Sequence, residues 1–241
     1  MSPLEQFEII PIIQIPFIVF TNSTLILFLT FFFFLSYVKM FKKGTFIPTR
    51  WQLFFESIYN TAFELTYANI GKKGAFFFPL IFVLFLFILS CNLIGMIPYS
   101  FTVTSHLIVT FSLALTTFLG FNIIGVQRHK LNFLSLLLPS GASLALVPLL
   151  VPIELVSYVF RVISLPVRLF ANMMAGHTLL KVIAGFAWLM VNLGGLMFII
   201  HFIPLFLLVL LVGLEFGVAM IQAYVFTILT CMYINDALNL H

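Results

Sequence analysis

Residues Leu193 to Asn235 read LGGLMFIIHFIPLFLLVLLVGLEFGVAMIQAYVFTILTCMYIN, and this stretch decides the class of fold. It is apolar almost throughout and carries one charged side chain, Glu215. A helix rises about 1.5 Å per residue and the hydrocarbon core of a bilayer is about 30 Å thick, so about 20 residues complete an upright crossing. The stretch is about twice that long, which predicts a steeply tilted membrane helix.

A second overlong apolar run precedes it, from about Pro148 to Phe186. As a helix this run would be more than about 50 Å long, so it must tilt steeply, kink near Pro166, or both. A short turn at Trp188 to Asn192 is predicted to join the two runs. Such a slanted hairpin suits contact with a curved partner better than packing in an upright bundle.

Three shorter apolar segments are also predicted to cross the membrane: Leu25–Met40, Ala75–Ile97 and Leu107–Val126. Between the first two, Arg50–Ile70 mixes aromatic and polar side chains in an amphipathic pattern, with Thr49 as its expected N-cap. Such a helix suits the membrane interface. The sequence therefore predicts an all-α integral membrane protein with about five membrane helices and one interfacial helix.

The composition supports this fold class. Of the 241 residues, 63% are hydrophobic and 7% are charged, whereas soluble domains carry about 25% charged residues. We predict one membrane domain over residues 1–241. It comprises the first span and the interfacial helix (17–73), a two-span hairpin (74–130) and the long tilted hairpin (147–241).

The basic residues gather in three clusters, which are Lys39, Lys42, Lys43 and Arg50; Lys72 and Lys73; and Arg128 with Lys130. With the predicted spans, all three clusters fall on one side of the membrane. By the positive-inside rule that side is the cytoplasm or the mitochondrial matrix, and the N-terminus faces the other side. Because the clusters punctuate apolar spans instead of forming one exposed face, they do not predict nucleic-acid binding.

Each of the two long runs carries one row of polar side chains. Glu154, Arg161 and Arg168 are seven residues apart, and seven residues return almost to the same direction on a helix. In the last run, four polar residues share one face at spacings of fourteen, seven and fourteen: His201, Glu215, Gln222 and Asp236. A charge inside the membrane costs about 2.5–3.5 kcal/mol on insertion scales, so the rows predict a proton path or a water-filled vestibule.

Arg168 lies deep in its run, which makes snorkelling to the interface a poor explanation. A structural pair with Glu154 is another alternative, but fourteen residues separate the two by about 21 Å along the helix axis. An arginine does not readily give up its proton, so it is a poor relay. We therefore interpret Arg168 as a fixed positive gate that attracts a carboxylate and blocks proton leakage.

Glu215 and His177 can titrate, so they are candidates for relaying protons. His177 stands nine residues after Arg168, on the opposite helix face, and a structural histidine is an open alternative. Gln222 is equally consistent with an interhelical hydrogen bond. Arg161 is expected to set the depth of its helix at the basic interface.

No cofactor or metal is predicted. A metal site made by His177 and Glu215 would have two ligands without a recognisable spacing signature. The two cysteines, Cys91 and Cys231, lie within apolar runs and are expected to act as small hydrophobic side chains. Two further histidines are interpreted as structural groups near helix ends or cavities: His106 and His201. Without a phosphate-cradling loop or a nucleophile–base set, the isolated chain is not predicted to be an enzyme.

Residues Ser164–His177, SLPVRLFANMMAGH, resemble the signature of ATP synthase subunit a, whose core is Arg-Leu-x-x-Asn-x-x-x-Gly. Three further stretches are similar: NLIGMIP at Asn92–Pro98, QAYVF at Gln222–Phe226, and SPLEQF at Ser2–Phe7. The order and spacing of the segments agree over essentially the whole chain. The opening resembles mitochondrial members from plants and algae.

The resemblance implies that Arg168 faces the ring of c subunits and interacts with each ring carboxylate as it passes. Glu215, His177 and Gln222 would line the inlet half-channel from the intermembrane space. Asn172 would sit beside Arg168 and help to shape the site. Bacterial members usually place an acidic residue where His177 stands and a histidine where Glu215 stands, so this chain has the mitochondrial arrangement.

The same resemblance implies that Glu154 belongs to the exit half-channel towards the matrix, with Arg161 nearby. The protein would be a multi-pass subunit of the mitochondrial inner membrane that couples proton flow through F0 to rotation and ATP synthesis. Its partners would be the c-ring, other F0 and peripheral-stalk subunits, and membrane lipids. A stand-alone secondary transporter or ion channel with Arg168 as counter-ion is the alternative, but the Pro-containing hairpin has no counterpart in the first half of the chain.

Overall fold

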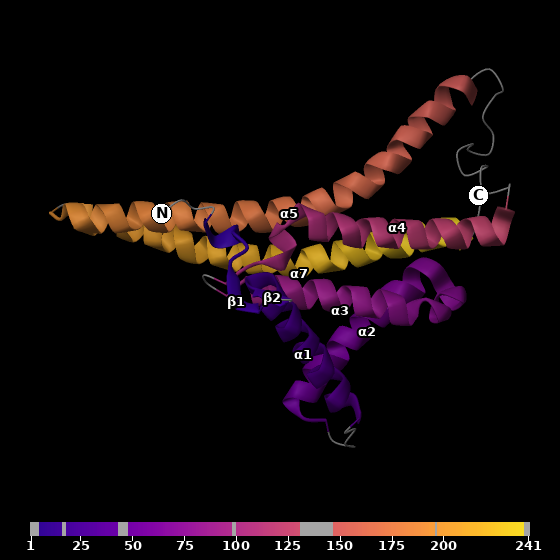
Figure 1. Ribbon diagram of the computed structural model, residues 1–241, viewed down its shortest axis with the longest axis horizontal. Coiled ribbons are helices and arrows are strands. Elements are labelled where there is room, and N and C mark those ends of the chain that lie inside the picture. The colour runs from indigo at the N-terminus through magenta and orange to yellow at the C-terminus, as the bar shows by residue number, and fades with distance from the viewer. Residues whose placement is uncertain are drawn as a thin grey trace. The chain divides into compact units, whose positions relative to one another are not determined.

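The computed structural model describes residues 5–15, 18–42, 48–97, 100–130, 147–195 and 197–238. The described residues are nearly all α-helical, which confirms the predicted fold class. Five helical segments among them are long and apolar enough to cross a membrane. The two longest helices are α5 (Val147–Leu193, 47 residues) and α7 (Phe202–Leu238, 37 residues), as Figure 1 shows.

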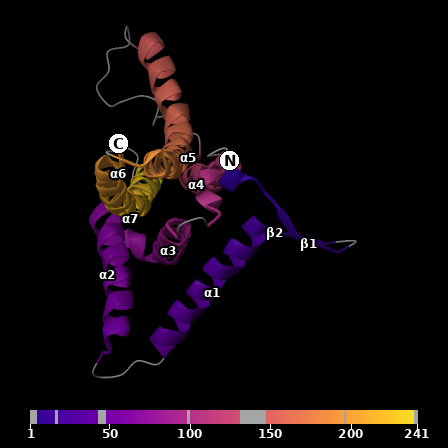
Figure 2. The same ribbon diagram turned by 90° about the vertical axis from the view of Figure 1, so that its left-hand side faces the viewer.

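The N-terminal part contains a β-hairpin that the sequence reasoning does not predict. After a short 3-10 helix, η1 (Glu5–Phe7), strand β1 (Pro11–Ile15) pairs antiparallel with β2 (Ile18–Thr21). The hairpin leads into α1 (Asn22–Lys42), as Figure 2 shows. Isoleucine and valine favour extended backbone, because their branched side chains crowd a helix. The prediction misses these strands because it considers only long apolar runs.

Helix α2 (Arg50–Ile70) has the predicted bounds and the predicted cap. The Thr49 hydroxyl accepts a hydrogen bond from the backbone N–H of Gln52, at 3.4 Å. At the other end Gly71 adopts a φ of +72°, which costs glycine no steric strain. The location of α2 at the membrane interface stays a prediction. In the basic cluster that precedes this helix, Lys43 lies outside the described residues.

Helix α3 (Phe78–Gly95) begins slightly later than predicted, because Gly71–Phe76 forms a 3-10 helix, η2. Its second residue is Pro79, whose missing N–H costs little in the first turn of a helix. Another 3-10 helix, η3 (Val103–Ser105), precedes α4 (Leu107–His129). Helix α4 matches the predicted span and extends it to the third basic cluster.

The end of α5 corrects the predicted turn. Trp188–Asn192 is helical, and the chain turns instead at Gly194 and Gly195, whose φ values are +63° and +60°. Such positive values favour glycine, and Trp188–Asn192 contains none to stop the helix. Helix α5 also continues through Pro152 and Pro166. The steep tilt of the hairpin and a kink at Pro166 stay predictions.

The last apolar run is divided, where the sequence predicts one helix. A short helix, α6 (Met197–Ile200), precedes α7, and His201 forms the turn between them. Pro204 explains this break, because it cannot donate to the carbonyl of Ile200 and its ring clashes with that carbonyl. Within α7, Pro204 stands in the first turn, where a missing N–H has no intrahelical partner to lose.

The chain forms two compact units, each assembled from segments far apart in the sequence. Unit 1 comprises Met1–Ser36, Phe87–His106 and Leu169–Ala223. Unit 2 comprises Tyr37–Leu86, Leu107–Arg168 and Tyr224–His241. Helices α5 and α7 each contribute one part to either unit. The polar row of α5 lies wholly in unit 2, whereas that of α7 is divided, with Asp236 in unit 2 and the other three residues in unit 1.

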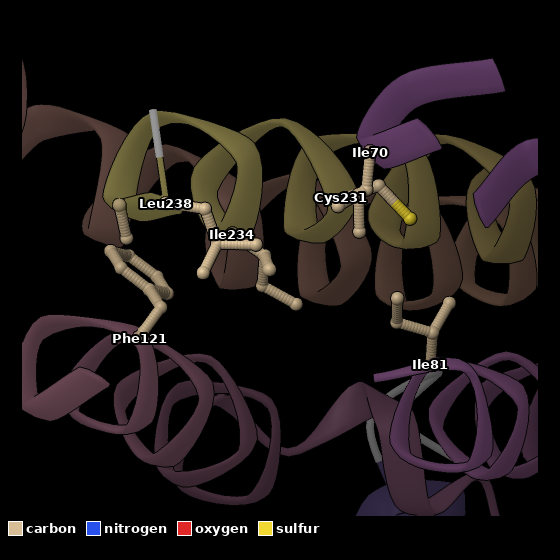
Figure 3. Close-up of a cluster of buried hydrophobic side chains, with 7 residues drawn as sticks. Ile70, Ile81, Phe121, Cys231, Ile234 and Leu238 are labelled. Atoms are coloured by element: carbon tan, nitrogen blue, oxygen red, sulfur yellow. The ribbon is translucent and has the colours of Figure 1, made fainter. Parts of the chain in front are cut away.

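The apolar core of unit 2 brings the end of α7 together with α2, α3 and α4. Figure 3 shows the Leu238 side chain directed towards Phe121, and Cys231 beside Ile70. All four side chains are buried. The thiol of Cys231 is free and is packed as a small apolar group, in keeping with the sequence interpretation. This packing fixes the end of α7, which carries Asp236, the last residue in the polar row of that helix.

Candidate functional site

His177 in α5 and Glu215 in α7 face each other inside unit 1. The imidazole Nε2 lies 3.6 Å from the carboxylate Oε1, and each residue is 6% exposed. Within the described residues, no group forms a hydrogen bond with Nε2 or with either carboxylate oxygen. A buried charge is costly unless it is paired or takes up a proton. At this separation a small movement brings the two atoms within hydrogen-bond distance, so the pair can exchange a proton.

Gly176 allows the close approach of α5 and α7. A Cβ atom at this position would lie 2.6 Å from Oε1 and 2.9 Å from Cδ of Glu215. Real Cβ atoms do not make contacts below 3.0 Å, so any side chain at position 176 would displace the carboxylate. The glycine therefore provides the space in which Glu215 meets His177.

A second polar contact joins the same two helices. The side-chain amide of Asn172 donates to Oε1 of Gln222 at 3.1 Å, and Gln222 is buried. Gln222 follows Glu215 by seven residues, so both project from one face of α7. The interhelical hydrogen bond that the sequence leaves open for Gln222 is therefore present. It continues the polar contact of His177 and Glu215 along the two helices.

Asn92 in α3 fixes α7 close to Glu215. Its amide nitrogen donates to the backbone carbonyl of Ala219 at 3.1 Å, and its side chain is fully buried. Ala219 lies one helical turn after Glu215. The motif NLIGMIP contains Asn92, but the sequence reasoning assigns this residue no role. A buried amide in an apolar span is the signal that marks it, because such a group needs a partner.

Arg168 belongs to unit 2, and its side chain is exposed. Among the residues that the structure describes, no carboxylate forms an ion pair with it. The structure therefore does not contain the pair with Glu154 that the sequence raises as an alternative. An exposed guanidinium on an apolar helix remains available to a carboxylate outside this chain.

Arg161 in α5 and Asp236 in α7 form an ion pair within unit 2. Nη1 of Arg161 lies 3.4 Å from Oδ2 of Asp236, and the guanidinium carbon lies 5.1 Å from the centroid of the Tyr233 ring. Each residue belongs to a predicted polar row, but the sequence does not predict that the two rows meet here. The side chains are 31% and 39% exposed, so the pair itself stabilises the fold by about 0–1 kcal/mol.

His106 and His201 lie beside helix ends, as interpreted from the sequence. His106 immediately precedes α4 and stacks on Phe101, with ring centroids 4.9 Å apart. Burial lowers the pKa of His106, which favours the neutral imidazole at pH 7. Nδ1 of His201 contacts the carbonyl oxygen of Phe198 in α6. Over the described ranges, no group of three or more His, Cys, Asp or Glu side chains is arranged to hold a metal ion.

The family model for the ATP synthase A chain matches residues 19–235. This chain belongs to the ATP synthase subunit a family. It is 55% identical to ATP synthase subunit a of Pylaiella littoralis, 54% identical to that of Chondrus crispus and 51% identical to that of Marchantia polymorpha. Each match covers 100% of this chain, and 99%, 97% and 99% of the respective relative.

As a member of the ATP synthase subunit a family, this chain is a proton-translocating F0 subunit and a multi-pass membrane protein. The family resemblance seen in the sequence is thus confirmed. Of the quoted motifs, Ser2–Leu4 and Pro98 lie outside the described residues. The proton-path roles of individual side chains stay predictions.

Replacing Gly176 by alanine is expected to lower proton-driven ATP synthesis by about ten- to a hundredfold, because the new methyl group moves the Glu215 carboxylate away from His177. The complex should still assemble, since a carboxylate at the end of a flexible side chain can rotate away. The rate per assembled complex in proteoliposomes checks this. Gly185→Ala on the same helix is the control, because a Cβ there meets nothing within 4 Å. Equal rates for the two variants would contradict the argument.

Proposed function

We propose that this chain forms inlet and exit half-channels against the c-ring of ATP synthase and couples proton flow to ring rotation and ATP synthesis. The observation that carries the proposal is the buried pair of His177 and Glu215 in a member of the ATP synthase subunit a family. Titratable groups buried between apolar helices are costly, and transport is the function that most often retains them.

The inlet half-channel passes His177, Glu215 and Gln222 from the intermembrane space. Glu215 takes up a proton and passes it on, and His177 faces it at 3.6 Å. The hydrogen bond between Asn172 and Gln222, at 3.1 Å, extends the polar groups along the facing sides of α5 and α7. A continuous row of donors and acceptors gives a proton successive partners inside an apolar surrounding.

Arg168 stands between the two half-channels and faces the c-ring. Its side chain is exposed, so a carboxylate on the ring can reach it. Because a guanidinium stays protonated, it attracts an ionised ring carboxylate and repels an excess proton. Protons therefore cross the membrane only when the ring carries them past Arg168.

The exit half-channel passes Glu154 and Arg161 towards the matrix. Arg161 is held by Asp236 at 3.4 Å, and Glu154 lies two turns earlier on the same face of α5. These three charged groups lie within unit 2. Charged side chains within membrane helices line a water-filled cavity or pair with one another, which supports an aqueous route at these three groups.

The transport cycle follows from the cost of burying charge. A ring carboxylate takes a proton from the inlet, crosses the lipid as a neutral group, and ionises at the exit. The neutral form is far cheaper to bury than the ionised form. The membrane potential supplies about 2.3 kcal/mol per charge per 100 mV. The partners are the c-ring, other F0 and peripheral-stalk subunits, and membrane lipids.

We place the protein in the mitochondrial inner membrane, with its N-terminus towards the intermembrane space and its basic loops towards the matrix. The relatives from algae and a liverwort support this location. The orientation rests on the three basic clusters, which fall on one side of the predicted spans.

Accessibility of introduced cysteines tests the two half-channels in the assembled complex. In a background of Cys91→Ala and Cys231→Ala, Gln222→Cys should react with a small, membrane-impermeant thiol reagent added on the intermembrane-space side. Glu154→Cys should react with the same reagent added on the matrix side. Val159→Cys, on the apolar exposed surface of α5, is the control and should react from neither side.

Reaction of both positions from both sides would indicate one continuous channel. That result would refute the two half-channels and would favour the alternative of an ion channel that works without a rotating ring.

A further inference from the structure

The N-terminal segment Gln6–Phe7 reaches the buried pair of unit 1. The Phe7 ring contacts the His177 ring, with centroids 6.4 Å apart and planes at 65°. This is the edge-to-face geometry that aromatic rings prefer. Phe7 lies 170 residues before His177 in the sequence, so the contact is made by the fold and not by local chain geometry.

Gln6 anchors this segment to the end of α3. Its Nε2 donates to the backbone carbonyl of Ser100 at 2.7 Å. Ser100 is itself fixed, because its hydroxyl donates to the carbonyls of Ile94 and Gly95 at 3.1 and 3.2 Å. These carbonyls belong to the last turn of α3, where helical partners are missing. Gln6, the residue next to Phe7, is therefore bonded to Ser100, which is itself held by the last turn of α3.

The same anchor is connected to the helix that carries Glu215. Helix α3 is tied to α7 by the hydrogen bond from Asn92 to the Ala219 carbonyl, one turn from Glu215. Phe7 thus contacts the imidazole on α5 from a support that is linked to α7. The segment Gln6–Phe7 therefore links the position of His177 on α5 to the position of Glu215 on α7.

A ring contact of this kind helps to select the orientation of the His177 imidazole. The χ2 torsion of histidine is broad and roughly two-fold, so packing or hydrogen bonds must select the ring orientation. No described residue forms a hydrogen bond with Nε2. Rotation of the ring about χ2 would carry Nε2 away from Oε1 of Glu215, which lies 3.6 Å from it.

We propose that Phe7 is a positioning residue of the proton path: anchored through Gln6, it holds the His177 imidazole in register with Glu215. This inference rests on the proposed function, in which these two side chains relay protons. It assigns the N-terminal segment a role in conduction, separate from the membrane helices.

Proton flux through assembled, reconstituted ATP synthase tests the inference with the variants Phe7→Leu and Phe7→Tyr. Leucine fills similar space without an aromatic ring, and we expect it to lower the flux by about two- to tenfold. Tyrosine keeps the ring, and Phe7 is partly exposed, so its hydroxyl can be accommodated and flux should stay near wild type. Ile9→Ala, at an exposed position two residues after Phe7, is the control.

Wild-type flux in Phe7→Leu, or equal losses in Phe7→Leu and Phe7→Tyr, would overturn the positioning role. If Phe7→Leu fails to assemble, Gln6→Leu replaces it: loss of the anchor should lower flux similarly, and wild-type flux there would also overturn the role. Glu215→Gln is measured beside them. If proton flux through Glu215→Gln equals that of the wild type, the proposed proton path itself is wrong. If Glu215→Gln abolishes the flux but Phe7→Leu conducts like the wild type, only the positioning role of Phe7 is refuted.

Discussion

An Arg168→Ala complex is expected to assemble and to lose proton-driven ATP synthesis by at least about a hundredfold. The exposed guanidinium has no carboxylate partner among the described residues, so its removal leaves no unpaired acid in this chain. The loss should therefore appear in coupling and not in folding. ATP synthesis by proteoliposomes under an imposed proton gradient, normalised to assembled complex, measures the effect.

Two further variants make this experiment specific. Arg168→Lys keeps a positive charge but loses the planar fork, so synthesis should fall less than in Arg168→Ala. Val167→Ala changes the neighbouring exposed side chain and should leave synthesis at the wild-type rate. If Arg168→Ala still couples proton flow to synthesis at a rate near wild type, Arg168 is a structural residue.

Glu215→Gln is the second substitution with a large expected effect, and we expect it to lower proton-driven ATP synthesis by about a hundredfold. Glutamine has nearly the same shape as glutamate, so it fits beside Gly176 and His177 without a cavity. It cannot take up or release a proton, which removes one member of the relay. Synthesis rates over a range of inlet pH values measure the loss, which more acidic pH should not rescue.

Glu56→Gln provides a matched control for this change. It makes the same chemical substitution at an exposed position of α2, and the rate of synthesis should not change. His177→Ala should also reduce synthesis, because it removes the partner that faces Glu215 at 3.6 Å. Normal synthesis by an assembled Glu215→Gln complex would show that protons do not pass through this carboxyl.

The long helices could be predicted because their signal is local. A continuous apolar run that is long enough to cross a bilayer must form a helix, because only a helix satisfies its own backbone hydrogen bonds in lipid. Both α5 and α7 coincide with such runs. The cap at Thr49 could also be predicted, because it depends only on one side chain and the first turn of α2.

The helix ends were predicted less well because single residues decide them. A pair of glycines with positive φ, Gly194 and Gly195, ends α5 at Leu193, just beyond the predicted turn at Trp188–Asn192. Pro204 separates α6 from α7 through a clash four residues earlier in the chain. Both signals are present in the sequence, but hydropathy averaged over a long window conceals them.

The partners of the site residues could not be predicted from periodicity. A spacing of seven shows that Glu215 and Gln222 share a face of α7, but not how that helix is rotated about its axis against α5. The contacts with His177 and Asn172 depend on that rotation and on the space left by Gly176. The approach of Phe7 depends on tertiary contacts alone and has no local signal.

The central claim is that Arg168 separates two half-channels, and passive proton flux through a ring that cannot rotate tests it most directly. The c-ring is cross-linked covalently to a stator subunit, and proton flux is measured in proteoliposomes under an imposed potential. We predict that the cross-linked wild type conducts no protons above the background of empty liposomes, whereas cross-linked Arg168→Ala leaks protons. A cross-linked Arg168→Ala complex that stays as tight as the wild type would contradict the account.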